Sequence, residues 1–453
     1  MKYGIRNGLF LGAFVLFSGQ AFAQTEIVNR DPVINEMVQE VSADSIESYV
    51  RKLSSFGTRH TLSSQTDPER GIGAAGNYIL SKFKEWAKES GGRLNPELDY
   101  FTLKADGRRV TEDVQVFNVV ATLNGTDPND DRVLIVSGHM DSRASSVMDP
   151  DIDAPGANDD GSGTAAVMEM VRVMSKKAFP HKIIFMTVTG EEQGLLGARY
   201  MAEKAKSENW NLVAMLNNDM IGNSNSSGTN INDNTQVRIF SEGVPSVESE
   251  REEALRKQLS LENDGISRQL ARYSKEVGER YVDQLQVKLI YRNDRFLRGG
   301  DHTPFAQNGY AAIRFCEMNE NYNYQHQNVT LRLGEKVGDL PEFVDYEYVR
   351  KITGMNVSVL ANLAKAPAAP ERAGINIRLE NSTSLSWEDP TGPKPKGYYV
   401  LMRETDQSMW QRKFYVEGNS VTLPYSKDNY LFAVQAVSAG GHESLPVIPL
   451  PTR

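Results

Sequence analysis

The sequence has a single cysteine, Cys316, and it lacks basic clusters and, beyond its first residues, long apolar runs. One thiol cannot form an internal disulfide, so the fold cannot depend on one. Cys316 follows the apolar run AAIRF and is expected to be a buried, unreactive side chain. The net charge of −9 disfavours nucleic acid as a partner. No later stretch is apolar enough to cross a bilayer, so no membrane span is expected.

The N-terminus has the pattern of a secretory signal. Lys2 and Arg6 precede the apolar run GLFLGAFVLFSG, and AFA ending at Ala23 forms a small-residue cleavage site before Gln24. The run is too short to span a hydrocarbon core of about 30 Å. We therefore expect residues 1–23 to be removed and the mature chain to be secreted or periplasmic.

Residues 24–365 alternate between strand and helix patterns. The runs VLIVS and KIIFMTV are short, β-branched and continuously apolar, which is typical of strands buried on both faces. Helical spacing of apolar residues is clearest in 68–89 and 161–177, and a closing helix is expected over 346–365. This alternation predicts an α/β fold, a three-layer sandwich with a mostly parallel central sheet.

The composition changes after the segment APAAPERAG, residues 366–374, which is expected to be a linker. Residues 375–453 contain short alternating strands separated by turn residues, and they predict an all-β sandwich. Trp387 and Tyr430 are expected to be core and corner residues of it. The runs LSW and YLFAVQAV resemble a fibronectin type III domain.

Several apolar runs of the first domain end in acidic or imidazole side chains. They are VLIVSGHMDS, IIFMTVTGEEQG and VAMLNNDMIG, and the intervening GANDDGSG adds two more acids. The carboxyl ends of parallel strands face one crevice, so these side chains should converge. So many carboxylates would repel one another unless cations neutralised them, which favours a metal site over a simple acid/base pair.

Each motif also has a plain structural interpretation. The carboxylate of Asp141 could accept the free ring N–H of His139, leaving the other nitrogen for a metal. Asp159 could bridge two cations or belong to a solvated turn. Glu191 and Glu192 could simply begin a helix, where acids are favourable. Alternatively, one of them binds metal and its neighbour acts on a water molecule as a base.

Together these blocks and the later His326 resemble the secreted bacterial di-zinc aminopeptidase family, related to glutamate carboxypeptidase, over about residues 40–365. The resemblance implies two Zn²⁺ ions per chain, with Asp159 bridging them. The five implied metal ligands are His139, Asp159, Glu192, Asp219 and His326. His139 and Asp219 would complete the coordination of one ion, and Glu192 and His326 would complete that of the other. Glu191 would be the general base, and Asp141 would orient His139.

The resemblance implies an exopeptidase that acts on peptides. Among exopeptidases, an aminopeptidase is the favoured expectation. Zinc lowers the pKa of water towards ~7 and polarises the scissile carbonyl. Glu191 would pass the proton of that water to the leaving amine. A carboxypeptidase or dipeptidase on the same scaffold is the alternative within this class. A non-catalytic binding or adhesion protein is the alternative outside it, and the family's glutaminyl cyclases fit the two-metal ligand set less well.

The sequence departs from the family pattern in two places. Gln325 precedes the last His ligand where some relatives have Tyr, which leaves Tyr324 as either an oxyanion donor or a packing residue. In RGGDHTPF, Gly300 replaces a serine, so Asp301 and His302 are expected to lie at the rim or behind the ligands. The remaining histidines are expected to be ordinary surface or packing residues. They are His60, His181 and His442.

Overall fold

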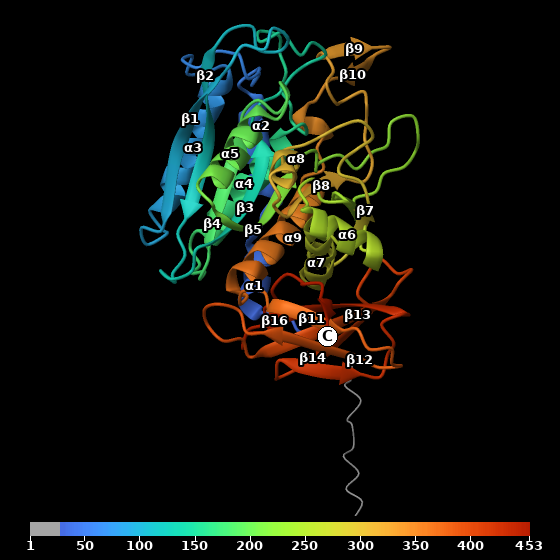
Figure 1. Ribbon diagram of the computed structural model, residues 1–453. Helices are drawn as coiled ribbons and strands as arrows, with labels where there is room; N and C mark the ends of the chain where they lie inside the picture. Colours follow the sequence, from blue (N-terminus) through green and yellow to red (C-terminus); the bar gives the residue numbers. More distant parts are fainter. Residues whose placement is uncertain (1–27) are drawn as a thin grey trace, which may run out of the picture.

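The computed structural model describes residues 28–453, which form an α/β domain and a smaller β domain beneath it (Figure 1). The signal segment expected at residues 1–23 lies outside the described residues, so export stays a prediction. Within the described residues, no helix has both the length and the apolar character needed to cross a membrane.

An eight-stranded sheet forms the centre of the α/β domain, in the order β1-β2-β4-β3-β5-β8-β6-β7. Its strands are β1 (Leu94–Leu103), β2 (Val114–Leu123), β3 (Arg132–His139), β4 (Lys182–Val188), β5 (Asn211–Asn218), β6 (Gln236–Phe240), β7 (Gln286–Ile290) and β8 (Ala312–Glu317). The central strands β4, β3, β5 and β8 are parallel. Antiparallel pairings join β1 to β2, β2 to β4 and β6 to β8. The predicted mostly parallel sheet is confirmed, with antiparallel flanks.

Helices cover both faces of the sheet. One face packs against α1 (Pro32–Glu40), α2 (Ala43–Ser54), α3 (Ile72–Ala87), α4 (Gly161–Met174), α7 (Ile266–Tyr281) and α9 (Tyr346–Lys365), and the other against α5 (Leu196–Ser207) and α8 (His302–Gln307). Along β3, Leu134 and Val136 belong to the first core, whereas Val133 and Ile135 belong to the second. This alternation follows from the two-residue period of a strand. The three-layer sandwich is confirmed.

Three further short elements lie outside this core. The helix α6 (Glu250–Leu259) has no buried residue, and the hairpin β9 (Thr330–Arg332) and β10 (Glu335–Val337) projects from the α/β domain (Figure 1). Cys316, on β8, is fully buried as predicted, and burial raises the pKa of its thiol to about 11.

The first turn of α4 packs directly against the ends of β3 and β5. A Cβ atom on Gly163 would lie 2.2 Å from the carbonyl oxygen of Asn218, so this close approach requires glycine. Asp160 caps the helix by accepting a hydrogen bond from the Gly163 amide at 2.9 Å, and it also accepts one from the His139 amide at 2.9 Å. The motif GANDDGSG therefore locks the start of α4 onto the strand ends.

The C-terminal domain consists of two sheets, β15-β12-β11-β17 and β14-β13-β16. The strands are β11 (Glu371–Asn376), β12 (Thr383–Glu388), β13 (Gly397–Glu404), β14 (Arg412–Val416), β15 (Ser420–Leu423), β16 (Tyr430–Val437) and β17 (Leu450–Thr452). Trp387 is buried in the core between them. The predicted all-β domain is confirmed, although β11 begins inside the segment 366–374 expected to be a linker. Its assignment to the fibronectin type III class stays a prediction.

Buried polar contacts hold the two domains together. Glu443 of the β domain accepts hydrogen bonds from Arg280 on α7, at 2.7 Å, and from Asn362 on α9, at 2.9 Å. Burial alone would raise the pKa of Glu443, but the charges of Lys413 and Arg280 hold it at about 2. A second buried pair joins Arg403 to Asp264 at 2.8 Å. The β domain is therefore fixed to the α/β domain.

Replacing Glu443 by glutamine should lower the free energy of unfolding by about 2 to 3 kcal/mol, because Arg280 and Lys413 then lose a buried counter-ion and are left with the partly exposed Glu276. Urea unfolding of the purified chain measures this difference. The control is Glu388→Gln, which removes an exposed partner of Arg372 and should be nearly neutral. Equal midpoints for both variants would show that the interface network does not stabilise the fold.

Candidate metal centre

The predicted site residues come from the carboxyl ends of neighbouring strands. His139 is the last residue of β3, and Asp219 directly follows β5. Glu191 and Glu192 lie in the loop after β4, and Asp159 lies just before α4. His326 reaches the site from the long loop after β8. The convergence expected for a parallel sheet is thus observed.

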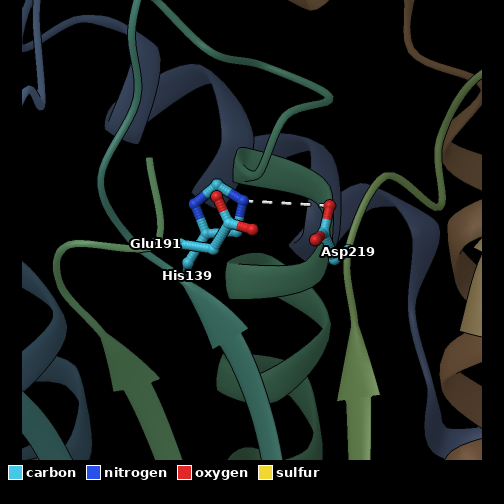
Figure 2. A group of neighbouring side chains, drawn as sticks. All are labelled: His139, Glu191 and Asp219. Carbon is cyan, nitrogen blue, oxygen red and sulfur yellow. Dashed lines mark ion pairs between the residues drawn. The ribbon is translucent and has the colours of Figure 1, made fainter. Parts of the chain in front are cut away.

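Two groups of possible metal ligands form at this edge. One contains His139, Glu191 and Asp219, and the other contains Asp159, Glu192 and His326. Within each group, one ligand atom from each residue lies within 4.8 Å of the others. Figure 2 shows Glu191 beside the imidazole of His139, with Asp219 across from that ring at 3.8 Å. Glu191 therefore lies close enough to act on a molecule held in the first group.

Asp159 lies between the two groups. Its Oδ1 is 3.2 Å from Nε2 of His139, and its Oδ2 is 2.8 Å from Nε2 of His326. The same His326 nitrogen is 2.8 Å from Oε1 of Glu192. Each oxygen of Asp159 therefore faces a different group, which is the geometry that a shared ligand requires.

The electrostatics of the site favour bound cations. Burial alone would lower the pKa of His139, but the carboxylates of Asp141, Asp159 and Asp219 beside its ring raise it well above its usual range. The pKa of His326 is likewise raised to about 10, against the effect of burial, by Glu192 and Asp159. These carboxylates stabilise positive charge at both imidazoles, and a divalent cation would take the place of each proton.

The donor atoms fit zinc. Imidazole nitrogens and carboxylate oxygens are its ordinary ligands together with thiolate. Nε2 of His139 is buried and has no hydrogen-bond partner among the described residues, so it is free to bind a metal. The other ring nitrogen, Nδ1, lies 3.0 Å from the backbone oxygen of Asp141, a contact that fixes which nitrogen faces the site.

Asp141 contacts the site through its backbone oxygen and through both oxygens of its carboxylate. Its backbone oxygen, rather than its carboxylate, makes the closer contact with His139, since Oδ1 lies 3.6 Å from Nδ1. Its carboxylate accepts hydrogen bonds from the backbone amides of Glu191, at 3.3 Å, and Glu192, at 3.1 Å. Thr61 donates a third hydrogen bond at 3.0 Å. Asp141 therefore ties the loop after β4 to the end of β3.

Three residues that the motifs did not identify also support the site. Arg143 binds Glu192 at 2.8 Å and lies 2.6 Å from Nδ1 of His326. Arg314 binds Asp219 at 2.8 Å. Its position as the one charged residue of the apolar run AAIRF is a sequence signal that could have identified it. Asp339 accepts hydrogen bonds from the backbone amides of Asn158 and Asp159, both at 2.8 Å, and no sequence pattern marks it.

The segment RGGDHTPF leads into α8 and agrees with one of the two positions expected for its Asp and His. Asp301 and His302 are fully buried and do not lie at a rim. The carboxylate oxygens of Asp301 have no hydrogen-bond partner among the described residues, and burial raises its pKa to about 7. Nε2 of His302 lies 2.7 Å from the backbone oxygen of Asn293. Both residues therefore lie behind the ligands.

Tyr324 has a packing contact. Its ring stacks on Phe343 with centroids 3.9 Å apart. The three histidines outside the motifs are buried, and each contacts another group. They are His60 beside the Val147 oxygen, His181 beside Asp130, and His442 beside Asp31. These contacts agree with the packing roles expected for them.

A cavity of about 240 Å³ opens over the two ligand groups. Asp159, Glu191, Glu192, Asp219 and His326 all line it. Its apolar wall includes Leu195 and Leu297. The carboxylates are therefore accessible to a small ligand from one side.

The chain is similar to known proteins along most of its length. A family model described as peptidase family M28 matches residues 118–329. A "Probable zinc metalloprotease" of Leptosphaeria maculans is 42% identical over 420 residues, covering 92% of this chain and 97% of that protein. A protein of the same description from Pyrenophora tritici-repentis is 40% identical over 428 residues, covering 93% and 98%. These relatives are fungal.

Solved structures share the fold at low sequence identity. The LapA aminopeptidase of Legionella pneumophila matches with a TM-score of 0.53 and 19% identity, over 80% of this chain and 81% of that one. An aminopeptidase from an Aneurinibacillus species matches with a TM-score of 0.50 and 14% identity, over 72% and 95%. These similarities establish the fold alone.

Proposed function

Because this chain belongs to peptidase family M28, we propose that it is an aminopeptidase that releases single residues from the N-terminus of peptides. Family membership makes it a zinc-dependent hydrolase of peptide bonds. The observation that carries the proposal is the position of Asp159 between two ligand groups, with Glu191 beside one of them. Both of these relatives are fungal, so they do not support the bacterial origin in the resemblance expected from the motifs.

In this proposal the chain holds two zinc ions. His139 and Asp219 would hold one, Glu192 and His326 would hold the other, and Asp159 would be shared between them. Zinc bound there supplies a Lewis acid for the scissile carbonyl and lowers the pKa of water. Arg143 and Arg314 fix the orientations of the carboxylates of Glu192 and Asp219.

Glu191 is the proposed proton carrier. Burial raises its pKa well above the usual range, and Asp219 and Glu192 add to this effect, against the charge of His139. A carboxylate with a raised pKa accepts the proton of the attacking water readily and can hold it until the amine leaves. The hydrogen bond from its backbone amide to Asp141 keeps Glu191 in place beside His139.

The carboxylates that line the cavity over the ligand groups support this direction of cleavage, because they would stabilise a positively charged substrate amine. Four arginines line the same cavity: Arg109, Arg143, Arg295 and Arg298. Proteins of this fold that are named aminopeptidases provide a precedent.

A carboxypeptidase or dipeptidase is the second candidate, because Arg295 and Arg298 line the same cavity and could bind a C-terminal carboxylate. Peptides blocked at one end separate the two candidates. An aminopeptidase should hydrolyse a C-amidated peptide and should fail on its N-acetylated counterpart, because the acetyl group removes the amine charge. Product masses from both digests give the result, and release of the C-terminal residue from the N-acetylated peptide would overturn the proposed direction.

A further inference from the structure

A second cavity, of about 760 Å³, opens beside the metal centre, and Glu320 is the only carboxylate residue that lines it. Five arginines line it too and define what we name the arginine cleft: Arg143, Arg238, Arg292, Arg295 and Arg298. Three of these, Arg143, Arg295 and Arg298, also line the cavity over the ligand groups, as does His326. The arginine cleft is therefore continuous with the metal centre.

The arginine cleft carries an excess of positive charge. Glu320 is shared between Arg238, at 2.7 Å, and Arg295, at 2.9 Å. Arg143 binds Glu192 at 2.8 Å. Arg295 also lies 3.8 Å from Asp294, so three carboxylates pair with the five guanidinium groups, in a chain whose net charge is −9. A positively charged cleft on a protein of negative net charge attracts an anionic ligand.

Two of the arginines are available for such a ligand. Arg292 and Arg298 are exposed, and neither has a carboxylate partner within residues 28–453. The guanidinium of Arg292 lies 5.7 Å from the centre of the Phe296 ring, a contact that orders the side chain without neutralising its charge. Structural ion pairs therefore account for the other arginines of the cleft but not for these two.

Arg292 and Arg298 both belong to the loop between β7 and α8. Arg295, midway between Arg292 and Arg298, is anchored by Glu320. Leu297 is 86% exposed and lines the cavity over the ligand groups. The anchored centre of the loop thus holds its two unpaired arginines beside the path of a peptide that enters the metal centre.

We propose that the arginine cleft binds a carboxylate of the peptide substrate, so that the enzyme prefers acidic peptides. This inference rests on the proposed hydrolysis at the metal centre. The planar guanidinium fork matches the geometry of a carboxylate and binds it through two parallel hydrogen bonds. The carboxylate is either an acidic side chain next to the cleaved residue or the free C-terminus of a short peptide.

Three tripeptides distinguish these sources: Leu-Ala-Ala amide, Leu-Glu-Ala amide and Leu-Ala-Ala with a free carboxylate. Leucine is placed first because Leu195 and Leu297 line the cavity. The wild-type enzyme should hydrolyse a carboxylate-bearing peptide with a kcat/KM about 5- to 20-fold higher than that for Leu-Ala-Ala amide. This gain lies between the contribution of an exposed ion pair and that of a hydrogen bond to a charged group. The gain should lie mainly in KM and should decrease as the salt concentration rises.

The variant R292Q/R298Q should lose this preference, so that its kcat/KM for each carboxylate-bearing peptide equals its own kcat/KM for Leu-Ala-Ala amide. The control R251Q/R378Q removes the same charge from two exposed arginines that do not line the cleft, and it should retain the preference. Equal rates on all three peptides for the wild type, or a preference that survives in R292Q/R298Q, would overturn the inference.

Binding to the Glu191→Gln protein separates this inference from the proposed activity. Calorimetry should show that a carboxylate-bearing tripeptide binds more tightly than the amide, and that adding R292Q/R298Q removes the difference. Equal affinities would overturn the arginine cleft as a carboxylate site. If the wild type hydrolyses none of the peptides but the Glu191→Gln protein still binds the carboxylate-bearing ones more tightly, the arginine cleft is supported. That result would overturn only the aminopeptidase proposal.

Discussion

Replacing Glu191 by glutamine should lower kcat by about 10²- to 10⁴-fold, the usual contribution of a positioned general base. The amide has nearly the shape of the carboxylate but cannot accept a proton from water at neutral pH. Glu191 lies beside His139 (Figure 2) and lines the cavity over the ligand groups, and burial raises the pKa of its carboxyl. Hydrolysis of an aminoacyl anilide gives the rate.

The zinc content and the unfolding midpoint of the Glu191→Gln protein should stay close to those of the wild type, because the five proposed ligands are intact. Glu203→Gln is the matched control, since Glu203 is an exposed residue on α5 and should leave kcat unchanged. Turnover retained in Glu191→Gln would remove this residue from its proposed role. A loss of zinc in the same variant would make it a ligand instead.

Removing zinc with a chelator should lower the rate by about 10³-fold or more, because polarisation of the carbonyl by metal contributes several kcal/mol and each 1.36 kcal/mol is tenfold in rate. Added zinc should restore the activity, and metal analysis should give two zinc ions per chain. The chelator saturated with zinc beforehand is the control. Activity that is indifferent to the chelator would exclude the metal mechanism.

Zinc removal should also lower the unfolding temperature, which provides a measurement independent of activity. A ligand that binds only the folded protein stabilises it. Without cations, the carboxylates of Asp159, Glu191 and Asp219 repel one another at a site from which water is largely excluded. An unchanged unfolding temperature after complete zinc removal would show that these ligands do not hold the metal in the folded chain.

Much of the fold was predictable because it depends on local patterns. The helix predicted over 346–365 is α9 with the same bounds, since a capping Asp345 precedes a long apolar stripe. The helix predicted over 68–89 begins later, at Ile72, because Asp67 and Ser64 hold the preceding residues in a turn through hydrogen bonds to backbone amides. Buried parallel strands are recognisable as continuous apolar runs, which made the central sheet identifiable.

The sequence by itself determined the class of the fold, the residues that gather at the strand ends and the family to which they point. Only the tertiary structure decided what surrounds them. Arg143, Arg314 and Asp339 come from separate parts of the chain, burial decides between the two positions expected for Asp301, and Arg292 and Arg298 have no carboxylate partner among residues 28–453. Hydrophobic patterns are local and therefore readable along the chain, whereas the partner and solvation of a charge depend on elements that meet only in the folded protein.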